Sequence, residues 1–339
     1  MLHNVIMYLL KLMRPLLLKG HERSITKIKY NLEGDLLFSS SKDKTPSVWY
    51  SANGERLGTY DGHNGVIWCL DVAWDSRRLL TGSGDNDAIF WDVETGGLLH
   101  RLKSRSAIRT CGFSYSANIF FLTTDATYNQ DCTVLFYDCR DREQMVKNKP
   151  YQKIDVNDQV SKITAAVWGP LGEILITGHE NGDLCHYDPK TGDRNTLVSE
   201  HVGKINDLQT TSDCLLLISA SKDSTSKLFN PYSLDCLKTY KTERPVNSAC
   251  ISPLKEHILL GGGQEAIDVT TTSNQAGKFE ARFYHLIFEE EFARVKGHFG
   301  PINTLAFHPD GKSYASGGED GYVRIHYFDD DYLNYEFEQ

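Results

Sequence analysis

An internal repeat with a fixed spacing limits the possible folds of this chain more than any other feature. At four places a histidine is preceded by glycine or glutamate and followed 22 residues later by an aspartate, with an aromatic ring six residues further on. The four sets are His21–Asp43–Trp49, His63–Asp85–Trp91, His201–Asp223–Phe229 and His298–Asp320–His326. Two spacings that coincide four times indicate duplicated structural units rather than one unique site.

A β-branched residue four positions after each histidine extends this register along the whole chain. The residues in this position lie at intervals of 42, 41, 55, 42, 41 and 56, and they are Ile25, Ile67, Ile108, Ile163, Ile205, Val246 and Ile302. The register defines seven units, two of which are longer than the rest by about 14 residues. In three units the histidine position holds Ser104, Gln159 or Thr242. In units three and four, Ala126 and Asn181 stand at the aspartate position.

Each unit has the pattern of four short strands. The first contains "SITKIKYN", "DLLFSSS", "PSVWYS" and "ERLGTY", which are rich in β-branched and aromatic residues and separated by turn-forming residues. No window shows a helical period. We therefore predict an all-β fold, a seven-bladed β-propeller with four antiparallel strands per blade, because a closed ring protects the sheet edges. The predicted blades are 20–61, 62–103, 104–157, 158–199, 200–240, 241–296 and 297–328.

The segments outside these units have separate roles. "RPLLL" (14–18) precedes His21 as an outermost strand precedes each later histidine, so we predict that it joins the last blade and closes the ring. Residues 1–12 are predicted to be a disordered extension or the product of an upstream start, since the apolar run is too short to span a bilayer and lacks the features of a signal peptide. A targeting helix is the alternative. The acidic, aromatic tail 329–339 is either a disordered terminus or a contact segment.

Composition excludes several classes of function. The net charge of -9 argues against nucleic acid as the main partner, because binding phosphates requires a basic surface. The eight cysteines are scattered singly, which is typical of reduced thiols in the cytosol and not of a zinc site. We expect a cytoplasmic protein with no membrane contact and no sequence-specific contact with nucleic acid.

The repeated polar residues are expected to form buried hydrogen-bonded sets that stabilise the blades. Buried polar groups need partners, and we expect the histidine, a serine two residues before the aspartate, the aspartate and the tryptophan to form one hydrogen-bonded chain. The expected sets are His21, Ser41, Asp43 and Trp49; His63, Ser83, Asp85 and Trp91; His201, Ser221 and Asp223; and His298 with Asp320. A catalytic triad is the alternative interpretation, but the same trio recurs in several blades and no G-x-S-x-G motif is present. We predict no enzyme activity, no cofactor and no metal site.

The stretch "GGGQEAIDVTTTSNQAGKFEARFYH" (261–285) carries the extra residues of the sixth unit. Gln264 falls at the aspartate position, so the insertion lies between the second and third strands. The stretch lacks the strand–loop–helix context of a phosphate loop. A polar loop of this length is usually functional or disordered, so we predict a partner contact that involves Gln264, Glu265 and Asp268.

The histidine–aspartate–tryptophan pattern resembles the WD-repeat family from Met13 to about residue 328. The stretches "GHERSITKIKYNLEGDLLFSSSKDK", "GGGQEAIDVTTTS" and "GHFGPINTLAFHPDGKSYASGGEDGYVRIHYF" resemble, more narrowly, the family of subunit i of eukaryotic translation initiation factor 3. Family members start at a position equivalent to Met13, so residues 1–12 depart from the family pattern.

This resemblance implies a non-catalytic scaffold subunit that binds subunits b and g. The assembly would sit with the small ribosomal subunit and support preinitiation-complex assembly and scanning. The family's acidic contact with subunit b corresponds here to Asp207 and Asp223. The alternative function is a generic WD-repeat adaptor that presents partners to a kinase, a receptor or a ubiquitin ligase, because the fold by itself does not determine function.

Overall fold

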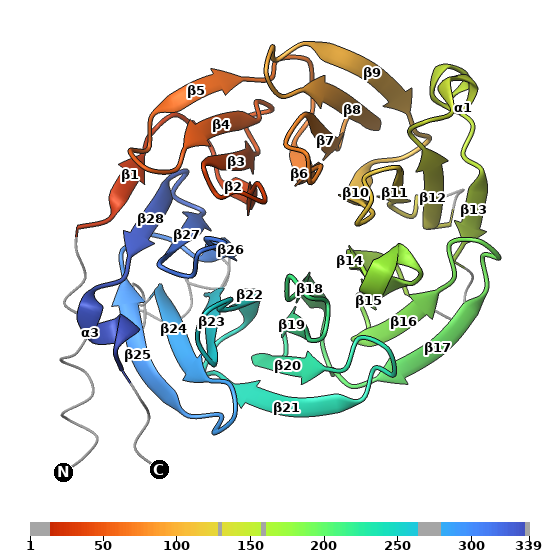
Figure 1. Cartoon of the computed structure of the whole chain (residues 1–339). Helices are drawn as coiled ribbons and strands as arrows, with labels where there is room; N and C mark the ends of the chain where they lie inside the picture. Colours follow the sequence, from red (N-terminus) through yellow and green to blue (C-terminus); the bar gives the residue numbers. More distant parts are fainter. Residues whose placement is uncertain (1–13, 128–130, 157–160, 264–278, 336–339) are drawn as a thin grey trace.

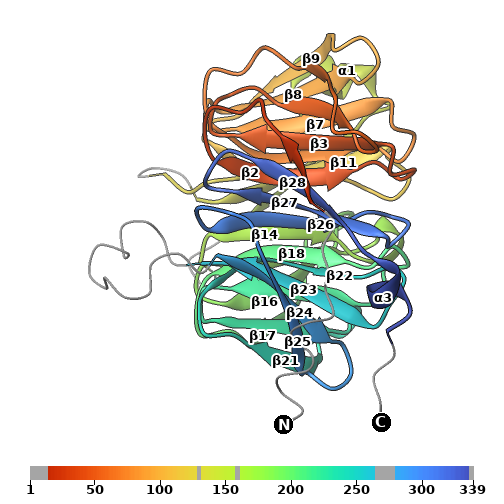
Figure 2. The same ribbon diagram turned by 90° about the vertical axis from the view of Figure 1, so that its left-hand side faces the viewer.

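Seven four-stranded antiparallel sheets form a ring in the computed structural model, which describes residues 14–127, 131–156, 161–263 and 279–335 (Figure 1). In six blades the strands pair in chain order from the inner strand to the outer edge, and in the seventh the outermost strand is the first of the chain. Seen from the side, the strands cross the thickness of the ring and their connections lie on its two faces (Figure 2). The predicted all-β propeller fold is confirmed.

The strands of the first four blades have the following bounds. From the inner strand outward they are β2 (Ile25–Tyr30), β3 (Leu36–Ser41), β4 (Ser47–Tyr50) and β5 (Arg56–Thr59) in blade one; β6 (Ile67–Val72), β7 (Arg78–Ser83), β8 (Asp87–Asp92) and β9 (Leu98–Lys103) in blade two; β10 (Ile108–Phe113), β11 (Ile119–Thr124), β12 (Thr133–Asp138) and β13 (Gln152–Asp155) in blade three; and β14 (Ile163–Trp168), β15 (Leu175–His179), β16 (Asp183–Tyr187) and β17 (Arg194–Ser199) in blade four.

The remaining three blades follow the same order. They consist of β18 (Ile205–Thr210), β19 (Leu217–Ser221), β20 (Thr225–Phe229) and β21 (Cys236–Lys241) in blade five; β22 (Val246–Ile251), β23 (His257–Gly262), β24 (Glu280–His285) and β25 (Glu291–Lys296) in blade six; and β26 (Ile302–Phe307), β27 (Ser313–Gly318), β28 (Val323–Tyr327) and β1 (Leu16–Leu18) in blade seven. The insertion predicted in blade six lies between β23 and β24, and most of it falls outside the described residues.

The β-branched residues that define the repeat are the first residues of the seven inner strands, and all of them are buried. Four of them, Ile25, Ile108, Ile205 and Ile302, pack on a glycine in the second strand of the preceding blade. A Cβ added to Gly317 or Gly82 would lie 2.6 Å from the side chain of Ile25 or Ile108, respectively. The close fit between an isoleucine and a glycine therefore determines how near adjacent blades approach.

A β-bulge follows the β-branched residue in every blade. The register between inner and second strand shifts at this point in all seven sheets. The bulge changes the direction of the side chain of the residue that follows the β-branched residue. At five junctions this side chain donates a hydrogen bond to the backbone carbonyl of the β-branched residue in the next blade. The donors are Thr26 to Ile67, Thr164 to Ile205, Asn206 to Val246, Asn247 to Ile302 and Asn303 to Ile25. The last of these bonds joins blade seven to blade one.

The ring is closed by the N-terminal strand, as predicted. β1 pairs antiparallel with β28, with Leu16 opposite Ile325 and Leu18 opposite Val323. Leu18 is buried in the cluster that holds Ile25, Trp49 and Ile325 together. Segments at opposite ends of the sequence therefore share one blade, which removes the unpaired edge that an open ring would have.

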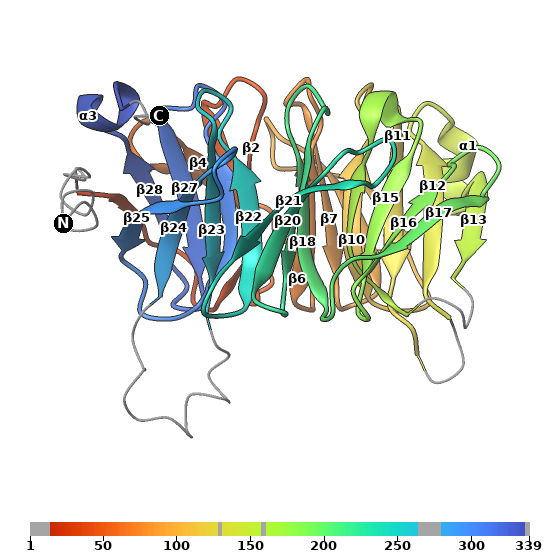
Figure 3. The same ribbon diagram turned by 90° about the horizontal axis from the view of Figure 1, so that it is seen from below.

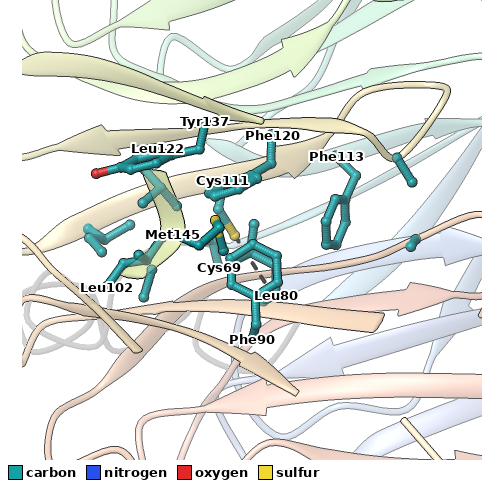
Figure 4. Close-up of a cluster of buried hydrophobic side chains, with 14 residues drawn as sticks. Cys69, Leu80, Phe90, Leu102, Cys111, Phe113, Phe120, Leu122, Tyr137 and Met145 are labelled. Carbon is teal, nitrogen blue, oxygen red and sulfur yellow. Dashed lines mark hydrogen bonds between the residues drawn. The ribbon is translucent and has the colours of Figure 1, made fainter. Parts of the chain in front are cut away.

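The described residues include two short α-helices that the sequence patterns did not predict. α1 (Arg142–Lys147) connects β12 to β13; Asp141 caps it by accepting from the backbone N–H groups of Glu143 and Gln144. Its Met145 side chain packs into the core between blades two and three (Figure 4). A helix of six residues is too short to show a hydrophobic period.

The first part of the C-terminal tail packs on the propeller. α3 (Asp330–Leu333) follows β28 and is capped by Asp329. Its Tyr332 ring stacks on Phe328 with ring centroids 4.0 Å apart, and its hydroxyl lies 2.9 Å from Nδ1 of His257 in β23. The helix therefore connects blade seven to blade six on the outside of the ring.

We predict that ring closure depends on the inward-facing leucine of β1. Leu18→Ala should destabilise the protein by about 2–5 kcal/mol, because it leaves a cavity in a buried cluster. Leu17→Ala in the same strand should change stability by no more than about 0.5 kcal/mol, because its side chain is exposed. Differential scanning calorimetry measures both. Equal shifts in Tm for the two variants would contradict the proposed role of β1.

Candidate functional site

The repeated histidine, aspartate and tryptophan of blade one meet through a single hydroxyl group. Nδ1 of His21 lies 2.7 Å from the carboxylate of Asp43, and Nε2 lies 2.7 Å from Oγ of Ser39. The indole Nε1 of Trp49 donates to the same Oγ at 2.7 Å. Because a carboxylate can only accept, Nδ1 donates its proton to Asp43 and Nε2 accepts from the hydroxyl. Each buried polar group of the set therefore has a partner.

Blade two repeats this arrangement with a threonine. Nε2 of His63 and Nε1 of Trp91 both lie 2.8 Å from Oγ1 of Thr81, and Nδ1 of His63 lies 3.1 Å from the carboxylate of Asp85. The backbone N–H of Asn64 also donates to Asp85, at 2.7 Å. The aspartate thus ties the loop before the inner strand to the turn after the second strand.

The linking hydroxyl lies four residues before the aspartate, not two as expected. The expected residues Ser41, Ser83 and Ser221 instead accept from the backbone N–H of the aspartate, at 3.2 Å in each case. Ser41 ends β3, where its hydroxyl also donates to the carbonyl of Arg23. The four linking residues are Ser39, Thr81, Ser219 and Ser316.

Blades five and seven keep histidine, aspartate and hydroxyl but replace the tryptophan. Nδ1 of His201 lies 2.9 Å from Asp223, whose carboxylate also accepts from Oγ1 of Thr225. Phe229 has no group to donate. In blade seven, Nδ1 of His298 lies 3.1 Å from Asp320.

The tryptophan position of blade seven has a different environment. His326 stacks on Tyr314 with centroids 4.7 Å apart, and its Nδ1 is buried without a hydrogen-bond partner. Arg324, also buried, donates to Asp320 at 2.8 Å and so supplies a further partner for that carboxylate. The aspartates of blades five and seven thus have hydrogen-bond partners, although neither blade has an indole N–H to complete the set.

Blade four builds its set from a histidine that the repeat pattern did not identify. His179 lies at the end of β15, is fully buried, and contacts Oγ1 of Thr177 through Nε2 at 2.9 Å and the carbonyl of Ser161 through Nδ1 at 2.7 Å. His179 lies two residues before Asn181. Asn181 occupies the aspartate position of this blade, and its Oδ1 accepts a hydrogen bond from Oγ of Ser161. The sequence signal that could have revealed this set is a histidine two residues before the position where the repeat lacks its aspartate.

The remaining sequence-predicted positions are arranged differently. In blade three, Asp125 pairs with Arg109 at 2.6 Å, and the Arg109 guanidinium lies 4.6 Å from the centre of the Trp68 ring. In blade six, Gln264, Glu265 and Asp268 lie outside the described residues, as do residues 1–12.

Burial and hydrogen bonding shift the pKa values of several groups in these sets. Burial tends to raise the pKa of the Asp43 carboxyl, but hydrogen bonds from His21 and from backbone N–H groups outweigh it and lower the pKa. The pKa values of Asp223 and Asp320 lie well below the ordinary range for the same balance of causes. Burial lowers the pKa of His63 and His298 despite the neighbouring carboxylates. The linking hydroxyls Ser39, Thr81 and Ser219 are fully buried, so no substrate can reach them.

The candidate partner residue Asp207 lies in the central channel. It is the third residue of β18, and its side chain is 9% exposed. Its carboxylate accepts from Nζ of Lys27 at 2.7 Å, which crosses from β2, and from Oγ of Ser248 at 2.6 Å. Asp223 lies in the turn after β19, on the face that carries the histidine loops. The structure therefore places one candidate in the channel and the other in a turn of the histidine-loop face.

The channel contains two cavities with different linings. One of about 540 Å³ is lined by Lys27, Lys42, Arg109 and Lys204 together with Asp207 and Glu319. The other, of about 300 Å³, is lined mainly by apolar groups.

Among the described residues, no group of three histidine, cysteine or acidic side chains could hold a metal ion. None of the helices in this part of the chain is long and apolar enough to cross a membrane.

We predict that the linking hydroxyl stabilises the fold. Thr81→Val should lower stability by about 1–3 kcal/mol, because His63 and Trp91 each lose a partner while buried. Thr81→Ser keeps the hydroxyl and should retain most of the stability. Thermal unfolding of the two variants provides the comparison. A valine variant as stable as the serine variant would show that the hydroxyl is not needed.

Acidification should destabilise the protein. Folded-state pKa values of His63, His298 and His326 lie below their ordinary value of 6.5, that of His326 at about 3. The unfolded chain therefore binds more protons, so the stability that these groups contribute is present above about pH 6.5 and is lost as the pH falls. We expect Tm to decrease from pH 7.5 to pH 5, and to decrease less in His326→Phe. A constant or rising Tm over this range would be incompatible with neutral buried histidines.

Known proteins match this chain over nearly all of its length. The profile of the EIF3I family matches residues 13–338. Eukaryotic translation initiation factor 3 subunit I from Taeniopygia guttata is 61% identical over 326 residues, which cover 96% of this chain and 100% of that protein. The proteins of the same name from Xenopus laevis and Homo sapiens are 61% and 60% identical over the same shares. The chain therefore belongs to the family of subunit I of eukaryotic translation initiation factor 3.

Proposed function

We propose that this protein is a non-catalytic scaffold subunit of translation initiation factor 3 in the cytoplasm. In this role it binds subunits b and g and supports preinitiation-complex assembly and scanning on the small ribosomal subunit. The observation that carries the proposal is the match to subunit I proteins, at 60–61% identity over their full length. A match of this extent includes the surface loops as well as the repeat, and binding residues are concentrated in loops.

The state of the reactive groups supports a non-catalytic role. The repeated trio of histidine, aspartate and hydroxyl occurs in blades one, two, five and seven, and in each blade it holds a loop against a turn. A catalytic hydroxyl must reach a substrate, whereas those of Ser39 and Thr81 already accept from an indole N–H beneath the surface.

We further propose that the contact with subunit b involves Asp207 and Asp223, following the family resemblance. Both carboxylates have partners within the chain: Asp207 binds Lys27, and Asp223 binds His201. A partner that engages Asp207 must therefore compete with Lys27 or add to it. The partial exposure of Asp223 leaves part of that residue accessible on the histidine-loop face.

Affinity purification of the tagged chain from cytosol tests the assembly. We expect recovery of the other subunits of initiation factor 3 in constant proportions, because a scaffold subunit is bound stoichiometrically. If a kinase, a receptor complex or a ubiquitin ligase is recovered instead, with no factor subunits, the protein is an adaptor of another kind and the proposal fails.

Two variants made in the same experiment isolate the role of Asp207. Lys27→Met removes the ion pair but leaves the carboxylate, whereas Asp207→Asn removes the charge from the same pair. If Asp207 contacts subunit b, Asp207→Asn should lower recovery of that subunit by about tenfold, as expected for a buried charged contact, while Lys27→Met retains it. Similar losses in both variants, accompanied by similar drops in Tm, would assign Asp207 to the fold alone.

A further inference from the structure

Blade three lacks the hydrogen-bonded set that blade two contains. The register places Ser104 where blade two has His63, and Ala126 where it has Asp85. Leu122 stands at the position of the linking hydroxyl, four residues before Ala126. Blade three therefore has neither the imidazole ring of the set nor the carboxylate and the hydroxyl that hold this ring in place.

A pocket of about 550 Å³ lies beside Ser104. Its lining comes from the end of β9 in blade two and from β12 and β13 in blade three. The helix α1, which lies beside β12 and β13 in Figure 3, contributes its C-cap residue Asn148. Pockets of roughly 300–1,000 Å³ are the usual size for small-molecule ligands.

The sheet pairing shows that this pocket is the space of the missing histidine. Tyr137, which lines the pocket, holds the place of Trp91, because each ring pairs with the residue two positions before the linking-hydroxyl position. Lys153 likewise holds the place of Arg101, because each pairs with the residue two positions before that aromatic ring. In blade two the ring of His63 lies beside Trp91, with centroids 6.2 Å apart. The same space in blade three contains no ring from position 104.

The residues around this space differ in charge between the two blades. Four positions change, and Gly62, Asn64, Asp85 and Asp87 of blade two correspond to Lys103, Arg105, Ala126 and Thr133 of blade three. Blade three therefore loses two carboxylates here and gains two cationic side chains. A space that holds a neutral ring in blade two thus becomes a pocket beside positive charge in blade three.

Two carboxylates also line the pocket, and they do not cancel this charge. Asp155 is paired with Lys153, with 2.6 Å between its carboxylate and Nζ. The other carboxylate belongs to Asp131. Lys103 and Arg105 are exposed, and neither forms an ion pair with another described residue. Three cationic side chains against two carboxylates leave the lining with an excess of positive charge.

The wall of the pocket carries hydroxyl groups. Within the described part of the chain, the hydroxyl of Ser104 has no hydrogen-bond partner and is available to a ligand. Oγ of Ser106 donates to a backbone carbonyl at 2.7 Å, and the hydroxyl of Tyr137 donates to Oδ1 of Asn148 at 3.0 Å. Since a hydroxyl oxygen also has two lone pairs, these groups can still accept hydrogen bonds from a ligand.

We propose that this pocket binds the phosphate group of a small phosphorylated polyol, such as a sugar phosphate or a nucleoside phosphate. Lys103 and Arg105 contact the phosphate oxygens, and Ser104 donates a hydrogen bond to them; lysine, arginine and hydroxyl groups are the usual partners of phosphate. The hydroxyl groups of the wall accept from those of the polyol. The pocket shares no residue with the contact at Asp207 and Asp223, and the inference does not depend on the scaffold role.

An NMR titration of the purified full-length chain tests the proposal. The probes are ribose 5-phosphate, ribose and adenosine monophosphate, in a phosphate-free buffer of constant ionic strength. We expect ribose 5-phosphate to bind saturably with a Kd of about 1 mM or lower. Ribose should bind at least about tenfold more weakly, because it lacks the charged group.

The adenosine monophosphate probe identifies the source of the phosphate. Tighter binding than that of ribose 5-phosphate assigns the pocket to nucleotides, and equal or weaker binding assigns it to sugar phosphates. No binding of either phosphate, or equal binding of ribose and ribose 5-phosphate, would overturn the proposal.

Matched double variants locate the binding. Lys103→Gln with Arg105→Gln should weaken binding of ribose 5-phosphate by about tenfold or more and leave Tm unchanged, because both side chains are exposed. Lys42→Gln with Lys204→Gln removes two cationic side chains from the channel cavity of about 540 Å³ and should leave binding unchanged. Equal losses in the two double variants would assign the binding to overall charge and contradict the pocket.

A second pair of variants tests the space itself. Ser104→Phe puts an aromatic ring where the other blades have an imidazole and should abolish binding, whereas Ser104→Ala leaves the space open and should weaken binding by no more than about fivefold. A phenylalanine variant that binds as tightly as the unchanged protein would place the ligand elsewhere. If Ser104→Phe lowers Tm, the double variants decide. If phosphate binding fails while the factor subunits still co-purify with the chain, the scaffold function stands and only the pocket assignment is lost.

Discussion

The fit of one β-branched residue against a small residue of the preceding blade is the contact on which the whole ring depends. Ile25, Ile108, Ile205 and Ile302 each pack on a glycine, and a Cβ on those glycines would come within 2.8 Å of the isoleucine side chain. The bulge after this residue then sends a side chain to the next blade at five junctions. Because blade seven makes the same contact with Ile25 that blade one makes with Ile67, the sheets close into a ring, and the strand β1 joins blade seven to complete it.

The hydrogen-bonded sets act at a different level, within single blades. Each holds the loop before the inner strand against the turn after the second strand, by means of an aspartate that accepts from a histidine and from backbone N–H groups. Blades that lack the set use substitutes: His179 in blade four and the Arg109–Asp125 pair in blade three. The requirement is that buried polar groups have partners, and several arrangements of residues meet it.

Once the ring is closed, its two faces differ in chemistry. On the histidine-loop face the sets of blades one, two, five and seven hold loops against turns. The channel behind this face is lined by several lysine and arginine side chains together with Asp207 and Glu319. The opposite face has exposed apolar side chains interspersed with carboxylates. The ring thus presents two chemically different faces, in a chain whose relatives are named as subunits of an initiation factor.

The sequence by itself determined the number of blades, the register of the inner strands and the closure by residues 14–18, because these follow from spacings that recur along the chain. It did not distinguish Ser39 from Ser41, since both lie on the same side of β3 and only the reach of the Trp49 indole selects between them. It also did not show α1, which depends on a single cap and one buried methionine. Nor could the common face of the exposed apolar side chains from Leu32 to Leu254 be found in this way, because only the closed ring brings their six distant loops to one face.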